Sequence, residues 1–227
     1  MKKILILHGA LGAKDQFYPL AEMLNDDFEI HLLNFSGHGG ETFKSQFNIP
    51  QFAQDVIDYL DENKIDKIDV FGYSMGGYVA LFLAKHYSET IGKIITLGTK
   101  FKWTPEIASK EIKMLNPLKI EEKIPKFAEV LKQRNLPNDW KEMMNKTSKM
   151  MIEMGEQNVL TIEDYKTINH IVKIGLADVD EMVTYEETIE VANALPNAQF
   201  YQLKNSNHPI EKVDSQLLIE EICSFLS

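Results

Sequence analysis

Ser74 is the residue whose surroundings point most clearly to chemistry. It lies in "DVFGYSMGGYVALF" (residues 69–82), with a glycine two positions before it and another two positions after it. An apolar run precedes the turn and an apolar helical pattern follows it, so the chain passes from a strand through a tight turn into a helix. Such a turn needs glycines and holds the hydroxyl at the edge of a sheet. We therefore predict that Ser74 is a nucleophile and not an incidental turn residue.

A serine hydroxyl needs a base to attack at neutral pH, and the base needs a carboxylate to orient it. After a serine turn of this kind the acid and then the histidine come later in the chain, each following a strand. His208 lies in a polar loop after the last apolar run, residues 199–203. The acid follows the preceding run, where the residues alone allow Asp178 or Asp180, with Glu181 as a weaker candidate.

The other histidines suit structural positions. His31, His86 and His170 lie within or beside predicted helices and strands, where a packed or surface histidine is the ordinary case. His8 and His38 lie in glycine-containing loops, and we expect both to be loop residues and not the base.

The loop after the first strand, "LHGALG", supplies the remaining part of the predicted site. A carbonyl under attack develops an oxyanion, which backbone N–H groups stabilise in a dry pocket. One donor is expected to be the amide of Met75, directly after the nucleophile. We predict the amide of Ala10 as the second donor, with Leu11 next in order.

Short apolar runs alternate with amphipathic helical patterns along most of the chain. The runs lie at residues 3–7, 30–33, 68–71, 94–97, 171–174 and 199–203. Continuous apolar strands are typical of a parallel sheet covered by helices on both faces. We predict an α/β fold with about six parallel strands and right-handed crossovers, whose core comprises residues 1–99 and 170–227.

Residues 100–169 interrupt this alternation with helical patterns and no convincing strand. "NDWKEMMNKTSKMMIEMG" places Trp140 and several methionines at helical spacings, and Thr161 with Asp164 predicts a capping box for a short helix. We interpret the segment as a helical cap inserted after the fourth strand. Its methionines either pack the cap onto the core, which is the ordinary case, or line an adaptable apolar pocket above Ser74.

Composition limits the class of protein. The net charge of −10 and the lack of a basic cluster argue against nucleic acid or an anionic membrane as a partner. The one cysteine, Cys223, excludes an intrachain disulfide and suits a reducing compartment such as the cytoplasm. "MKKILILHGA" reads as a first strand and not a secretory signal, and no run approaches the ~20 apolar residues of a membrane span. No metal-ligand cluster or phosphate-binding loop is present, so we expect no cofactor and no metal.

Together these segments resemble the α/β-hydrolase fold superfamily, particularly small bacterial serine hydrolases with a helical cap. The resemblance rests on "LHGALG", "NFSGHGG", "GYSMGG", "ADVDEMV" and "NHPIEKVD", and it spans nearly the whole chain. It implies that Ser74 is the nucleophile and His208 the general base, with the amides of Ala10 and Met75 as the oxyanion hole. Because the chain begins with the "HG" strand, the resemblance implies about six strands instead of eight.

The resemblance also bears on the acid. Relatives often carry Gly-Asp-x-Asp-x-x-Val, with the second aspartate in the triad. Alignment on Val183 assigns Asp180, although Ala177 stands where glycine is usual. Counting from Gly175 gives Asp178 instead, and we favour Asp180.

The expected reaction is acyl transfer from an ester or thioester to water, through an acyl-enzyme on Ser74. The partner is then a small-molecule ester or thioester, with an apolar acyl group if the methionines line the pocket. Alternatives on the same triad are carbon–carbon bond hydrolysis, a lyase step or perhydrolysis. A non-catalytic ligand-binding member of the fold is the alternative from another class. The resemblance disfavours menaquinone-pathway lyases, because they usually carry an arginine soon after the serine turn and Tyr78 follows the glycines here.

Overall fold

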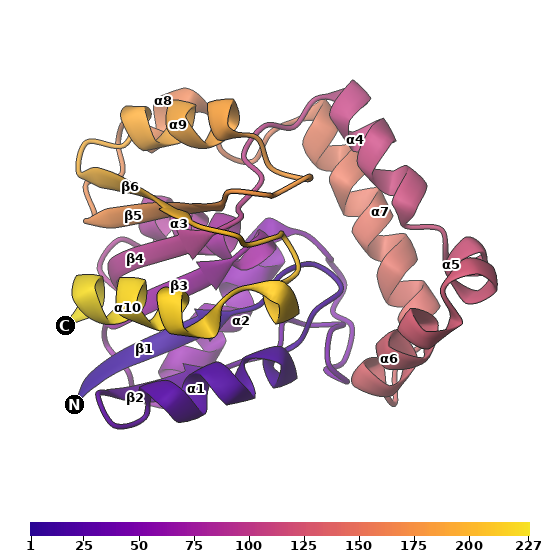
Figure 1. Cartoon of the computed structure of the whole chain (residues 1–227), viewed down its shortest axis with the longest axis horizontal. Coiled ribbons are helices and arrows are strands. Elements are labelled where there is room, and N and C mark those ends of the chain that lie inside the picture. Colours follow the sequence, from indigo (N-terminus) through magenta and orange to yellow (C-terminus); the bar gives the residue numbers. More distant parts are fainter.

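A single parallel β-sheet forms the centre of the protein in the computed structural model, which describes residues 1–227 (Figure 1). The strand order is β2-β1-β3-β4-β5-β6, and every neighbouring pair is parallel. The strands are β1 Lys2–Leu7, β2 Phe28–Leu32, β3 Ile68–Tyr73, β4 Ile91–Leu97, β5 Val172–Ala177 and β6 Ala198–Leu203. The predicted α/β fold with six parallel strands is confirmed.

Helices make up most of the connections between strands. The α-helices are α1 Tyr18–Leu24, α2 Ile49–Glu62, α3 Met75–His86, α4 Pro105–Glu111, α5 Pro117–Lys123, α6 Pro125–Asn135, α7 Trp140–Glu156, α8 Ile162–Tyr165, α9 Tyr185–Ala194 and α10 Ser215–Leu226. Three short 3-10 helices are η1 Lys14–Phe17, η2 Ile112–Met114 and η3 Ile210–Lys212. No helix combines the length and the hydropathy that a membrane crossing requires.

The helices cover both faces of the sheet. On one face α1 and α10 bury apolar residues such as Leu24 and Ile222 against the strands. On the other face α2, α3 and α9 contribute residues such as Phe52, Leu81 and Val191 to the larger core cluster. The burial of α3 along most of its length explains why its sequence is apolar nearly all round.

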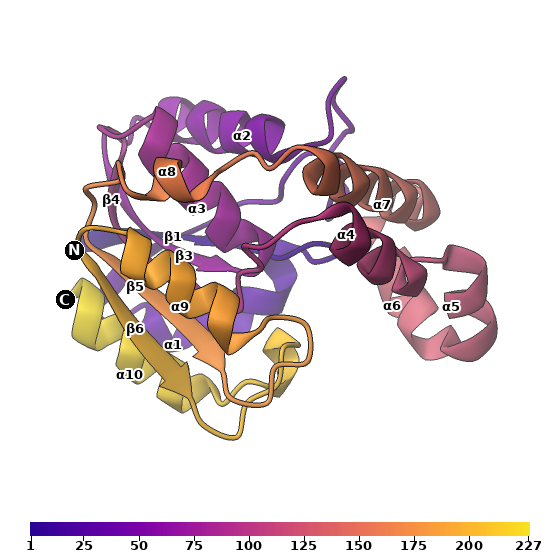
Figure 2. The ribbon, with the colours of Figure 1, turned by 90° about the horizontal axis from the view of Figure 1, so that it is seen from above.

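Residues 100–169, which lie between β4 and β5, contain no strand, and most of their helices lie beside the sheet. Figures 1 and 2 both place α4 to α7 at the end of the molecule opposite the two chain termini. A separate small apolar cluster joins α5, α6 and α7, whereas Met150 and Met154 of α7 belong to the main core. The last helix of this segment, α8, begins with the capping box of Thr161 and Asp164. It lies over the core near α9 (Figures 1 and 2).

Candidate active site

Ser74 lies in the turn between β3 and α3. Its φ of 51° falls in the left-handed region, which residues with a side chain rarely adopt. Close packing requires the glycines beside it, because a Cβ on Gly72 would meet the backbone of Gly77 and one on Gly76 would meet the carbonyl of Leu7. The glycines therefore let the start of α3 lie directly against β1 and β3, which fixes the position of the serine.

The Ser74 backbone is tied to the neighbouring strand. Its amide donates to the carbonyl of Leu97 at 2.9 Å, and its carbonyl accepts from the hydroxyl of Thr99 at 3.1 Å. The side chain is half-buried, and its hydroxyl makes no hydrogen bond in the chain. Ser74 lines a cavity, where its hydroxyl can meet a ligand.

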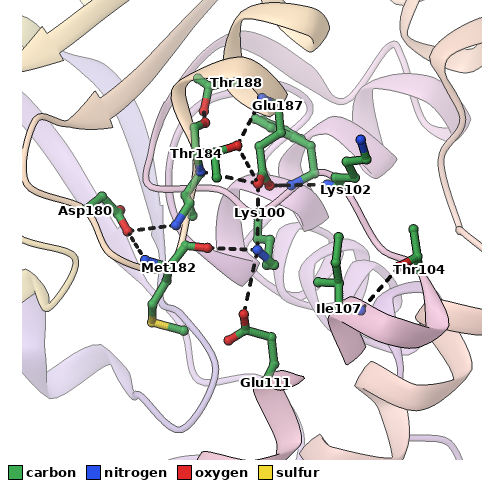
Figure 3. Close-up of polar contacts among 12 residues, drawn as sticks. Lys100, Lys102, Thr104, Ile107, Glu111, Asp180, Met182, Thr184, Glu187 and Thr188 are labelled. Carbon is green, nitrogen blue, oxygen red and sulfur yellow. Dashed lines mark hydrogen bonds and ion pairs between the residues drawn. The ribbon is translucent and has the colours of Figure 1, made fainter. Parts of the chain in front are cut away.

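His208 and Asp180 lie in direct contact after the ends of β6 and β5. The imidazole Nδ1 and the Asp180 Oδ2 are 2.7 Å apart, and the carboxylate side chain is only 1% exposed. The second oxygen, Oδ1, accepts the amides of Met182 at 2.8 Å and Val183 at 2.9 Å (Figure 3). Because an ionised carboxylate only accepts, Nδ1 carries the proton and the other ring nitrogen, Nε2, can act as a base. His208 and Ser74 line the same cavity, and no hydrogen bond joins them.

The other two candidate acids lie away from the imidazole. Asp178 is exposed, and its Oδ1 accepts the amide of Ser206 at 3.1 Å. That amide holds the pKa of Asp178 below its ordinary value. Glu181 is also exposed, so Asp180 is the candidate carboxylate that contacts the His208 ring.

The backbone amides predicted to bind an oxyanion have no acceptor within the chain. Ala10 and Met75 both line the cavity, and neither N–H donates a hydrogen bond. Met75 is the first residue of α3, where helix geometry leaves N–H groups without partners. Leu11, the next candidate, has a φ of 61°, and its amide also lacks an acceptor.

Two residues outside the sequence-based predictions support His208. The hydroxyl of Tyr73 donates to the His208 carbonyl at 2.7 Å. Gly98 follows β4 with a φ of 63°, and a Cβ there would lie 3.3 Å from the imidazole and 3.4 Å from Asp180 Oδ2. The sequence did offer a signal for Gly98, because a glycine directly after an apolar strand often marks a place where another group approaches the backbone closely.

A half-buried lysine, Lys100, connects the Asp180 loop to two helices. Figure 3 shows Lys100 between the Met182 carbonyl, Glu187 of α9 and Glu111 of α4. The ammonium donates to the Met182 carbonyl at 2.8 Å and lies 3.7 Å from Glu187 and 3.8 Å from Glu111. Glu187 in turn accepts the amide of Phe101 at 3.0 Å. This arrangement links the segment after β4, the start of α9 and the first helix of the insertion.

The cavity lies between the carboxyl edge of the sheet and the helical insertion. Its volume is about 340 Å³, which suits a small molecule. The lining is mostly apolar and includes Met150, Met151 and Met154 from α7. No three His, Cys, Asp or Glu side chains anywhere in the chain come together in a way that could hold a metal ion.

His8 and His38 are buried behind the loops and do not line the cavity. In His8, Nε2 accepts the amide of Phe35 at 3.1 Å and Nδ1 lies 2.8 Å from the Gly9 carbonyl, so both ring nitrogens have partners. Burial, with a contribution from His38, lowers the pKa of His8 well below its ordinary value. Burial also lowers the pKa of His38 to about 4, and its ring stacks on Phe47.

The buried histidines predict a loss of stability in mild acid. The unfolded chain takes up a proton on His38 near pH 6.5, whereas the folded protein does so only near a pKa of about 4. The unfolded state therefore binds more protons as the pH falls through this window, and the free energy of unfolding should fall by about 3 kcal/mol from His38 alone. Urea titrations at neutral and acidic pH should show a smaller loss for His38→Phe than for the wild type. An equal loss in both proteins would contradict this assignment.

The chain belongs to the alpha/beta hydrolase fold family, whose sequence pattern matches residues 2–149. It is 34% identical over 94 residues to esterase YbfF of Escherichia coli (strain K12), a match that covers 41% of this chain and 37% of the esterase. It is 25% identical over 150 residues to a probable alcohol acetyltransferase of Wickerhamomyces anomalus, which covers 65% of this chain and 41% of that protein. The matched regions thus span well under half the length of these curated relatives.

A solved structure extends the similarity in fold to the whole chain. The serine hydrolase CCSP0084 from Cycloclasticus zankles superposes with a TM-score of 0.82 at 21% sequence identity, over 100% of this chain and 90% of that one. At this identity the likeness concerns the fold alone.

Proposed function

We propose that this protein is a serine hydrolase that cleaves a small carboxylic ester or thioester through an acyl-enzyme on Ser74. The observation that carries the proposal is the 2.7 Å contact between His208 and Asp180, with the imidazole lining the cavity that Ser74 also lines. Membership of the alpha/beta hydrolase family and the similarity to an esterase support the same reaction class.

In the proposed mechanism, His208 Nε2 takes the proton of the Ser74 hydroxyl as the oxygen attacks the carbonyl carbon. Asp180 holds the proton on Nδ1 and stabilises the imidazolium that forms. The oxyanion is bound by the amides of Ala10 and Met75. His208 then protonates the leaving alcohol or thiol, and water releases the acyl group by the same steps. The hydrogen bond between Ser74 and His208 forms when substrate is bound, since catalytic hydrogen bonds often tighten only in the complex.

The methionines of α7 support an apolar acyl or alcohol group in the substrate. Met150 and Met154 are buried, Met151 is half-buried, and all three line the cavity. A flexible thioether adapts to chains of different shape, which suits a cavity of this kind. The single Cys223 supports a reducing compartment such as the cytoplasm as part of the same proposal.

A panel of p-nitrophenyl esters of increasing acyl length tests this proposal. The wild type should hydrolyse short and medium chains, and Met151→Trp should lose about tenfold in kcat/KM for the longer chains relative to acetate, because the indole fills cavity volume. Ile152→Trp is the matched control, since Ile152 is the next residue, is 40% exposed and does not line the cavity. Absence of ester turnover in the wild type would contradict the proposed function. If Met151→Trp and Ile152→Trp show the same dependence of kcat/KM on acyl length, the proposed position of the acyl chain beside Met151 is contradicted.

Acyl transfer to an alcohol instead of water is the second candidate. It uses the same acyl-enzyme, and the similarity to a probable alcohol acetyltransferase over 65% of this chain favours it. Hydrolysis assays with added hexanol separate the two, because a transferase would form the hexyl ester faster than the free acid. Perhydrolysis uses the same acyl-enzyme and would form a peroxy acid when hydrogen peroxide is added to the ester assay. Ligand binding without catalysis would leave simple esters unconverted.

A further inference from the structure

Glu111 is a polar side chain of the cavity lining that forms no side-chain hydrogen bond with its neighbours. The lining residues Gln16 and Glu211 bond to each other at 2.7 Å, and Arg134 bonds to Asp15 at 3.3 Å. The hydroxyls of Tyr73 and Tyr78 also bond within the chain. Apart from the Ser74 hydroxyl and His208 Nε2, the carboxylate of Glu111 is therefore the polar group of the lining that reaches the cavity without a hydrogen bond.

The carboxylate of Glu111 is almost covered yet still reaches the cavity. Its side chain is 9% exposed, and its oxygens are not among the fully covered polar atoms that lack partners. The indole N–H of Trp103 also lacks a partner, but it is fully covered and does not reach the cavity. An ionised carboxylate in an apolar setting is unfavourable unless it is paired and hydrogen-bonded.

The nearest positive charge to Glu111 is too far away for a direct hydrogen bond. Lys100 Nζ lies 3.8 Å from the Oε1 of Glu111 (Figure 3), whereas N–H···O hydrogen bonds are about 2.7–3.2 Å long. The ammonium donates one N–H to the Met182 carbonyl at 2.8 Å and lies 3.7 Å from Glu187. It therefore has donor capacity left on the side of Glu111.

We infer that Lys100 and Glu111 form a subsite for a hydroxyl group of the substrate, an inference that rests on the proposed function. An oxygen about 2.8 Å from both Nζ and Oε1 fits a gap of 3.8 Å between them. A hydroxyl accepts from the ammonium and donates to the carboxylate, so it satisfies both groups.

Other substrate groups suit this pair less well. A carboxylate would be repelled by Glu111 and Glu187, and an ammonium would be repelled by Lys100. An ether accepts from Lys100 and leaves Glu111 without a donor. An alkyl group leaves the carboxylate of Glu111 without any hydrogen bond. The substrate class is therefore an ester or thioester that carries a hydroxyl on an otherwise apolar chain.

Matched substrates test the subsite. The p-nitrophenyl esters of ω-hydroxy acids and of their ω-methoxy analogues, over a range of chain lengths, place the group on the acyl side. The ω-hydroxyalkyl and ω-methoxyalkyl acetates place it on the alcohol side. At the best length in one of the two series, the wild type should favour the hydroxyl by about tenfold in kcat/KM, as expected for a hydrogen bond to a charged group.

Variants of residues in α4 test whether Glu111 causes the preference for hydroxyl over methoxy substrates. Glu111→Leu should bring the hydroxyl-to-methoxy ratio to about one, and Glu111→Gln should lower it part of the way, because the amide still accepts a hydrogen bond but carries no charge. Glu106→Gln is the matched control on the same helix, since Glu106 is exposed and outside the cavity. The ratio is taken within each variant, so general effects on folding or catalysis cancel.

A ratio near one at every length in both wild-type series would overturn the subsite, as would an unchanged ratio in Glu111→Leu. If the unsubstituted esters are still hydrolysed, the proposed function stands and the subsite alone fails. The same comparison can be made without turnover by titrating a linear alkanediol and its dimethyl ether against the tryptophan fluorescence of the protein, because Trp103 lines the cavity and the second tryptophan, Trp140, does not. The wild type should bind the diol more tightly and Glu111→Leu should not; equal binding in both proteins would also overturn the inference.

Discussion

Ser74→Ala should lower kcat for p-nitrophenyl esters by about 10⁴-fold or more, because it removes the atom that forms the acyl-enzyme. The fold should be unaffected, since the hydroxyl bonds to nothing in the chain and alanine keeps the Cβ that the turn already accommodates. Steady-state rates and thermal unfolding of the purified variant measure both effects.

Two comparisons make the Ser74 result specific. Ser88→Ala, at an exposed serine outside the cavity, should keep the wild-type rate. Ser74→Ala combined with His208→Ala should be no slower than either single variant, because residues that act as one unit do not contribute additively. A folded Ser74→Ala protein with near wild-type activity would contradict the proposed mechanism.

Asp180→Asn should lower kcat by about 10³- to 10⁴-fold while leaving KM nearly unchanged. The amide can donate to Nδ1 where the carboxylate accepts, so it favours the tautomer in which Nε2 carries the proton and cannot act as a base. The side chain of Asp180 is only 1% exposed and lies 2.7 Å from the imidazole, so water cannot replace it.

Asp178→Asn is the matched control for Asp180→Asn, because it makes the same chemical change two residues earlier. Asp178 is exposed and bonds to the amide of Ser206, away from the imidazole. Its variant should keep kcat within about twofold of the wild type, because Asp178 does not line the cavity and exposed substitutions usually change stability by less than about 0.5 kcal/mol. A larger loss in Asp178→Asn than in Asp180→Asn would reverse the assignment of the acid.

The sheet was predictable from the sequence because its strands are short apolar runs buried on both faces. The boundaries were less so: β4 begins at Ile91 and not at Ile94, since Gly92 and Lys93 are only half-buried and break the apolar pattern. The location of the candidate site at the carboxyl edge of the sheet was also predictable from the order of the strands. The carboxyl ends of parallel strands meet at one edge, so residues that follow β3, β5 and β6 come close together.

The groups that surround the His208–Asp180 pair could not be predicted in the same way. The contact between Tyr73 and the His208 carbonyl depends on the path of a loop 135 positions later in the chain. The approach of Glu111 to Lys100 depends on how α4 packs beside the sheet, and no periodic pattern in the sequence encodes that orientation. Both arise from tertiary packing of segments that have no shared local signal.

Covalent labelling of Ser74 tests the central claim most directly. A fluorophosphonate reacts with a serine whose hydroxyl is activated by a base, and mass spectrometry of the digested protein identifies the modified residue. We expect one stoichiometric adduct on Ser74, formed far more slowly in His208→Ala and Asp180→Asn. A folded wild-type protein that leaves Ser74 unmodified, or that carries its adduct on another residue, would contradict the account.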